Sequence, residues 1–229
     1  MVTWLHVNLL DRQANLRSLN LIALAIVIAT DLNYVRLLMR IKLVKTDGSV
    51  IENAATNIVG CVSNFQHSMF SFLSVSLNVK PVTFHETNYH YKCYIEKGLI
   101  DGSDAASTHL VSSFWYLDFP GELKESTSYA KKLNYHSNRK TLELYGRLHA
   151  VLFKYDKTLF NCVDMNIKLT RTTDSFYLLD PSDDNNSRIT ILDATLFITQ
   201  VHLKPSLLLA YANVLGMKRK AHYPVTHSN

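Results

Sequence analysis

The sequence lacks the features that mark most enzymes and most secreted proteins. It has only three cysteines among 229 residues, and Cys61, Cys93 and Cys162 lie far apart with no C-x-x-C pair. An odd number of cysteines that are far apart in the sequence is typical of reduced thiols in an intracellular protein rather than of a disulfide framework. No G-x-S-x-G, Walker or H-E-x-x-H motif occurs, so the sequence predicts no enzymatic activity and no catalytic residues.

A long apolar run and a concentrated patch of charge are also missing. Residues 21–29 form an unbroken apolar run, but a membrane-spanning helix needs ~20 such residues. Asp31 closes the run, and it starts later than a usual signal peptide, so we expect a buried strand, no transmembrane segment and no secretion. The net charge of +5 comes from basic residues scattered along the chain, which predicts no specific nucleic-acid site.

What the sequence does contain is a period-two alternation of apolar and polar residues. The stretches that show it are 35–43, 73–80, 142–152, 163–170 and 189–203. Successive strand side chains point to opposite faces, so each stretch is predicted to be a strand with one buried face. The side chains expected to point inward are Leu37, Met39, Val75, Leu77, Leu144, Leu148, Ile167, Leu169, Leu196 and Ile198.

Two local irregularities stand out in these predicted strands. Gly146 falls on the inner face of its strand, which favours a bulge or a close backbone approach. The last strand shifts phase after Ile191 and again between Ile198 and Val201. We therefore expect bulges that bend it.

Three shorter segments show helical spacing. The apolar sets that define them are Tyr91, Tyr94 and Ile95; Ala106, Leu110 and Phe114; and Leu207, Leu208, Tyr211, Val214 and Leu215. The third segment begins at Pro205, which suits a first helical turn, and Gly216 follows it as a stop signal. The sequence therefore predicts helices between the strands and one helix near the C-terminus.

The order of these elements resembles a known family. The resemblance rests on VRLLMRIKLVKTDGS (35–49), NFQHSMFSFLSVSLNVKPV (64–82), YHYKCYIEKGLIDGSDA (89–105), GRLHAVLF (146–153), NCVDMNIKLTRTTDSFYLL (161–179) and ITILDATLFITQVHLKPSLLLAYANVL (189–215). In order and spacing these segments resemble the first half of the double-jelly-roll major capsid protein of Polinton or Maverick virus-like transposable elements and adintoviruses. Several segments in one order are more specific than a single short motif.

The resemblance implies a fold and a role. The implied fold is all-β: an antiparallel jelly-roll sandwich with short inserted helices and a C-terminal linker helix. Residues 1–30 would be a divergent apolar segment, 31–204 the first jelly roll, and 205–229 the linker helix and the start of a second jelly roll. The implied function is structural, because three such subunits form a capsomer of an icosahedral virion shell around double-stranded DNA.

The family continues into a second jelly roll, whereas this sequence ends at Asn229. We therefore expect a truncated or transposon-derived copy, located in a virion or inside the cell, that does not form closed shells alone. Its expected partners are copies of itself, full-length capsid protein or a second jelly-roll half. Leu208, Tyr211, Val214 and Leu215 would pack on that second half, so some of them should be exposed and make the chain oligomeric.

Candidate ligand residues give a weak signal for a metal. His85, His90 and Cys93 offer ligand atoms, but their spacing matches no common zinc pattern, so ordinary packing is expected. His149 lies near Arg147 on one strand face, where an outer-face or interface position is expected rather than a catalytic base. We predict no metal and no cofactor.

Two charged clusters are expected to be solvated. An acidic, amide-rich cluster similar to a calcium-binding loop consists of Asp180, Asp183, Asp184 and Asn186. It lacks the glycine and the terminal glutamate of the EF-hand loop. The basic residues at 218–220 follow the last predicted helix, where positive charge complements the helix dipole. DNA contact by this short run is the alternative.

The runner-up function is a ligand-binding, lectin-like jelly-roll module, because fold alone does not assign function. Trp115, Tyr116 and Phe119 lie in a predicted loop and would line its sugar site. A cupin-type enzyme is a third class. It would need several histidines converging from the apolar strand faces, and these strands do not offer them.

Overall fold

The computed structural model describes residues 2–8, 18–24, 29–49, 59–83, 88–116, 132, 141–156, 158–160, 163–179 and 187–217. Its elements are, in order, β1 (Val2–Asn8), β2 (Ser18–Leu24), β3 (Ala29–Lys45), β4 (Gly60–Cys61), α1 (Phe65–Ser68), β5 (Phe70–Leu77), β6 (Lys80–Pro81), α2 (Tyr89–Ile100), α3 (Ser103–Ser107), the 3-10 helix η1 (His109–Ser113), β7 (Leu142–Arg147), the 3-10 helix η2 (Val151–Lys154), β8 (Thr158–Leu159), β9 (Asp164–Arg171), α5 (Asp174–Tyr177), β10 (Leu178–Leu179), β11 (Ser187–Val201) and α6 (Pro205–Gly216).

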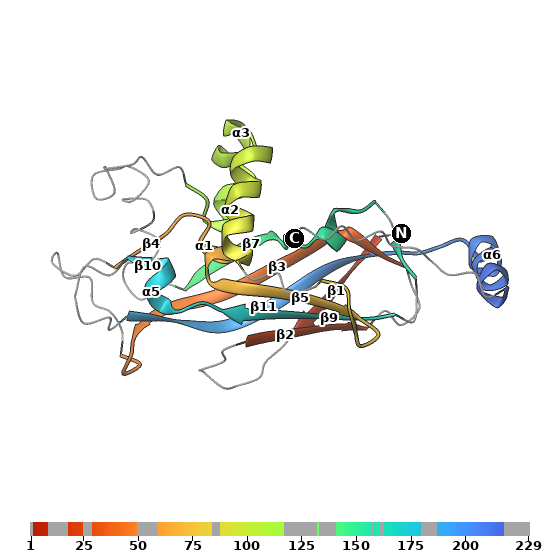
Figure 1. Cartoon of the computed structure of the whole chain (residues 1–229), viewed down its shortest axis with the longest axis horizontal. Coiled ribbons are helices and arrows are strands. Elements are labelled where there is room, and N and C mark those ends of the chain that lie inside the picture. Colours follow the sequence, from red (N-terminus) through yellow and green to blue (C-terminus); the bar gives the residue numbers. More distant parts are fainter. Residues whose placement is uncertain are drawn as a thin grey trace.

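The strands form two larger antiparallel sheets and one short pair (Figure 1). The five-stranded sheet has the order β1-β11-β3-β7, and β8 also pairs with β3. The four-stranded sheet has the order β2-β9-β5-β6, and β4 pairs with β10. Strands β1, β3, β7 and β11 lie in one large sheet and β2, β5, β6 and β9 in the other, so the chain passes between the two sheets repeatedly.

One hydrophobic core contains the inward side chains of both large sheets. Leu37 and Met39 of β3 meet Val75 of β5 and Ile167 of β9 in this core. The inward set expected from the alternation is buried throughout except for Leu77, which is partly buried. That prediction is confirmed, because strand periodicity alone decides which residues share a face.

The expected fold class, an all-β jelly-roll sandwich, is wrong. The described chain is mixed: it combines several helices with three small, open antiparallel sheets. Helices α2 and α6 are each 12 residues long. A period-two pattern identifies a strand and its buried face, but it carries no information on whether sheets close or on how much helix lies between the strands.

The five predicted strands are found as β3, β5, β7, β9 and β11, each with limits that differ from the predicted ones. The strand predicted for 142–152 ends at Arg147, and η2 takes up its last residues. Strand β11 has register shifts between Ile191 and Asp193 and between Phe197 and Thr199. The first shift is where the phase change predicted it, and the second comes slightly earlier in the strand.

The apolar run at 21–29 does not form one strand. Strand β2 ends at Leu24, residues 25–28 lie outside the described residues, and β3 begins at Ala29. Strand β2 pairs with β9, while β1 pairs with β11. The first thirty residues therefore add one strand to each large sheet.

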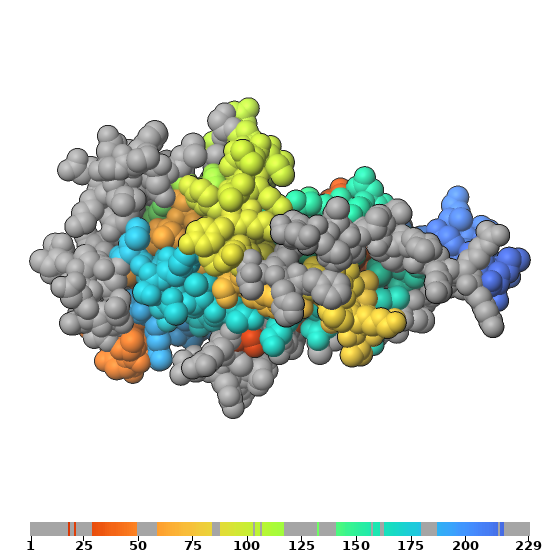
Figure 2. Space-filling view, viewed as in Figure 1, coloured from red at the N-terminus to blue at the C-terminus, as the bar shows by residue number. Residues whose placement is uncertain are grey.

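The helices follow the predictions in part. Helix α6 covers the expected segment. The helix expected through Ala106, Leu110 and Phe114 is divided into α3 and η1, because Thr108 between them has φ −115° and ψ −103°, outside the helical region. Figure 2 shows α2 and α3 standing out from the body in yellow and green, and α6 at one end in blue.

Candidate functional site

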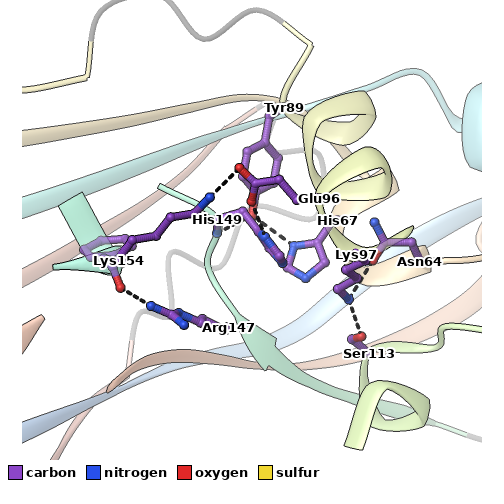
Figure 3. A network of polar contacts seen from close by, with 10 residues as sticks. Asn64, His67, Tyr89, Glu96, Lys97, Ser113, Arg147, His149 and Lys154 are labelled. Atoms are coloured by element: carbon purple, nitrogen blue, oxygen red, sulfur yellow. Dashed lines mark hydrogen bonds and ion pairs between the residues drawn. The ribbon is translucent and has the colours of Figure 1, made fainter. Parts of the chain in front are cut away.

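Helix α2 places a polar face against the body of the protein (Figure 3). Tyr89, Cys93 and Lys97 recur every four residues and therefore lie on one side of the helix. They are buried, with exposed fractions of 0, 0 and 4%. The helix thus brings a hydroxyl, a thiol and an amine to the interior.

The apolar residues whose spacing predicted this helix face outward. Tyr91, Tyr94 and Ile95 are 55, 52 and 57% exposed. The spacing predicted the helix but not the face that is buried. Helical spacing groups residues on one side without stating which side meets the core.

Two histidines face α2 from other parts of the chain. His67 lies on α1, is 1% exposed, and its Nδ1 is 2.9 Å from the Tyr89 hydroxyl. His149 follows β7, and its Nδ1 is 2.9 Å from Oε2 of Glu96. The two imidazole rings meet edge to face, with centroids 4.8 Å apart and an interplanar angle of 87°. The ligand atoms of His67, Cys93 and His149 all lie within 4.8 Å of one another.

Burial controls the protonation of this cluster. Desolvation lowers the pKa of His67 well below its usual value, and the nearby charges of Lys97 and His149 lower it further. Desolvation also lowers the pKa of His149, although the hydrogen bond to Glu96 opposes it. For Glu96, burial alone would raise the pKa, but hydrogen bonds from His149 and Lys154 outweigh this and bring the pKa to about 2. At neutral pH both imidazoles are therefore neutral and Glu96 is ionised.

A cavity of about 400 Å³ opens beside this cluster between α2, η1 and the end of β7. Its charged lining residues are Arg36, Lys97, Arg147 and Lys154, with Glu96 and Asp101. Lys154 donates to Glu96 Oε1 at 2.7 Å, and Arg147 donates to Asn33 Oδ1 at 2.5 Å. Among the charged side chains of the lining, cations outnumber anions.

Lys97 lies at the buried end of this cavity. Its ammonium group donates to Asn64 Oδ1 at 2.8 Å and to Ser113 Oγ at 2.6 Å. Both acceptors are neutral, so neither of them neutralises the charge of the buried ammonium. Burial lowers the pKa of Lys97 from 10.5 to about 8, with Cys93 and Asp101 opposing.

The lowered pKa of Lys97 gives a pH-dependent stability. Between pH 8 and 10.5 the folded chain binds fewer protons at Lys97 than the unfolded chain, so stability rises with pH in this window. We therefore expect the stability of wild type relative to Lys97→Met to increase as the pH rises from about 8 to 10.5. The increase should be lost as the pH falls back to about 8. Urea denaturation across this range measures the difference. Lys168→Met, on the exposed side of β9, is the control, and an equal pH trend in both variants would contradict the prediction.

The structure separates His90 from Cys93, two of the three residues first considered as metal ligands. His85 lies outside the described residues. The Nδ1 of His90 is 3.3 Å from the carbonyl oxygen of Phe70, and its ring packs on Phe176 with centroids 4.4 Å apart. Of the two that the structure describes, Cys93 joins the cluster and His90 does not. Sequence reasoning missed His67, for which no motif or spacing gave a signal.

The outer-face position considered for His149 is not found, and the interface position stays a prediction. Its side chain is 14% exposed and lies inside, against Glu96. Glu143, which lies on β7, is 61% exposed and pairs with Arg40 at 3.2 Å. His149 lies beyond the end of β7, where the strand alternation used to place it outward no longer applies.

The other candidate residues contribute no site in the described part of the chain. Trp115 is 5% exposed and its ring packs on Tyr94 with centroids 5.0 Å apart, so it presents no open platform for a sugar. Tyr116 is partly buried, and Phe119 lies outside the described residues. The acidic cluster Asp180, Asp183, Asp184 and Asn186 and the basic residues 218–220 also lie outside them.

Comparison with known protein families and with curated proteins finds no match for this chain. Among the described residues, no helix has both the length and the apolar character needed to cross a membrane.

Proposed function

We propose that this chain is a structural subunit of viral-coat type, related to the major capsid protein of Polinton and Maverick elements. The six resembling sequence segments support the proposal, and they contain all or part of β3, β5, α2, β7, η2, β9 and β11. These elements include the central strands of both large sheets. The work of such a subunit is burial and surface complementarity rather than bond-making.

The observation that carries the proposal is the apolar surface of α6. Leu207, Leu208, Leu209, Val214 and Met217 are 45, 38, 65, 43 and 70% exposed. Apolar residues at consecutive positions cover more than one side of a helix, and a helix of this kind is normally buried by a neighbour. Figure 1 shows α6 at one end of the molecule, beyond the sheets.

One side of α6 is tied to the body of the protein. The Tyr211 ring packs edge to face on Phe160, with centroids 5.1 Å apart. Of the residues expected to pack on a neighbouring domain, Leu208 and Val214 are exposed, and Tyr211 is partly buried. The side chain of Leu215 lies outside the described part. The remaining sides of α6 form a surface that we assign to a second copy of this chain, as in a self-assembling coat.

Leu209→Glu tests this assignment. We expect the wild-type chain to be oligomeric, because an exposed apolar patch drives association, and we expect Leu209→Glu to shift it towards monomer by placing a charge in the buried contact. Size-exclusion chromatography with light scattering measures both. Leu192→Glu is the matched control, since Leu192 is 42% exposed on β11, outside α6. A monodisperse wild-type monomer, or equal dissociation by both variants, would refute the proposal.

A further inference from the structure

We propose that His67, Cys93 and His149 form a Zn²⁺ site with three protein ligands and one open coordination position. This inference is independent of the proposed coat function. The three residues come from α1, α2 and the segment after β7, and their ligand atoms lie within 4.8 Å of one another. Two imidazoles and one thiolate are a ligand set that suits zinc, which binds nitrogen and sulfur in tetrahedral geometry.

The unpaired nitrogen of His67 points to a missing partner. His67 is 1% exposed, and its Nε2 has no hydrogen-bond partner. Leaving a buried polar group unsatisfied typically costs about 1–3 kcal/mol. Because the Tyr89 hydroxyl occupies Nδ1 at 2.9 Å, Nε2 is the atom free to bind a metal.

His149 is oriented in the way that metal ligands commonly are. Its Nδ1 donates to Glu96 Oε2 at 2.9 Å, and Lys154 holds the other oxygen of Glu96 at 2.7 Å. A carboxylate that accepts the Nδ1 proton fixes the tautomer in which Nε2 is the free ligand atom. The arrangement makes Glu96 a positioning residue behind His149.

The hydroxyl group of Tyr89 contacts all three proposed ligand residues. Its hydroxyl contacts His67 Nδ1, hydrogen-bonds the Cys93 thiol and lies 3.4 Å from the backbone nitrogen of His149. It accepts from the two N–H groups and can donate to the Cys93 sulfur. When zinc binds, the sulfur–hydrogen bond of Cys93 breaks, the proton leaves to solvent, and the thiolate sulfur takes the metal.

Zinc binding requires the three ligand atoms to move closer together. Bond lengths of a tetrahedral zinc site place its nitrogen and sulfur ligands about 3.3–3.6 Å apart, and here the largest separation is 4.8 Å. The Cys93 thiolate and the Glu96 carboxylate supply negative charge against the cation, while Lys97 opposes it. The fourth position is open to water, and the cavity beside His149 gives a route for the metal to enter.

Cobalt and zinc titrations of the full-length chain test the site. After chelator treatment under reducing conditions, Co²⁺ should bind one to one with a thiolate-to-cobalt charge-transfer band, and Zn²⁺ should displace it. Cys93→Ser should abolish the band, His67→Ala and His149→Ala should each weaken Zn²⁺ binding at least about tenfold, and Tyr89→Phe about tenfold through lost positioning.

Two matched variants control the experiment. Cys61→Ser removes another buried cysteine of the described chain, and His90→Gln removes a buried histidine on α2 that faces away from the cluster; both should keep the band and the affinity. Far-UV circular dichroism checks the folding of every variant. Failure of the wild-type chain to bind stoichiometric Zn²⁺ would overturn the proposal. Zn²⁺ binding by folded Cys93→Ser as tight as that of wild type would also overturn it.

Discussion

Phe65→Ala should lower the free energy of unfolding by about 3–5 kcal/mol, the usual cost of removing a fully buried aromatic ring. Phe65 begins α1 and is 0% exposed. Its ring centroid lies 6.0 Å from that of Phe114 and 5.8 Å from that of Tyr177. The ring therefore links three segments that are distant in sequence, and no single segment can move alone to fill the cavity.

Urea denaturation with fitted midpoint and slope measures this loss. Leu99→Ala, at a position 82% exposed on α2, is the matched control and should change stability by no more than about 0.5 kcal/mol. A loss below about 1 kcal/mol for Phe65→Ala would show that this aromatic cluster is not part of the cooperative core.

Gly146→Ala should destabilise the protein by about 1–3 kcal/mol through overpacking. A Cβ at this position would overlap Gln66 Oε1 and lie 3.1 Å from the Ser113 Cβ. Gln66 cannot easily move away, because its Nε2 donates to the backbone oxygen of Leu37 at 2.7 Å in a buried position. The loss of stability therefore comes from a clash with the Gln66 side chain, which its hydrogen bond holds in place.

A double-mutant cycle isolates this clash. In a Gln66→Ala background the cost of Gly146→Ala should fall by 0.5 kcal/mol or more, as for other residues in contact. Gly98→Ala is the control, since a Cβ there meets nothing within 4 Å and alanine favours a helix by about 1 kcal/mol. Equal destabilisation by both glycine substitutions would show that the close approach to Gln66 has no energetic effect.

Sequence patterns predicted the parts of the fold that depend on local geometry. Alternation identified the strands and their inward side chains, the phase change located the bulge after Ile191, and Pro205 and Gly216 bracketed α6. Gly146 was predicted to mark a bulge or a close backbone approach, and its neighbours show the close approach. Each of these features follows from a few consecutive residues.

The candidate site was not predictable in the same way. His67 lies in a helix of four residues with no motif around it, and Cys93 was grouped with His85 and His90 because they are near in sequence. The structure instead joins Cys93 to His67 and to His149, a residue more than fifty positions further on. Helix α2 turned its polar side inward because that side finds hydrogen-bond partners in α1, η1 and the segment after β7.

The sequence by itself therefore determined which segments are strands, which of their side chains are buried and where α6 begins, because the period of a strand or helix is a property of the local backbone. Only the tertiary structure decided the mixed fold class with open sheets, the buried face of α2 and the grouping of the two histidines with Cys93. Those outcomes depend on contacts between residues far apart in the chain, whose free energies no local pattern records.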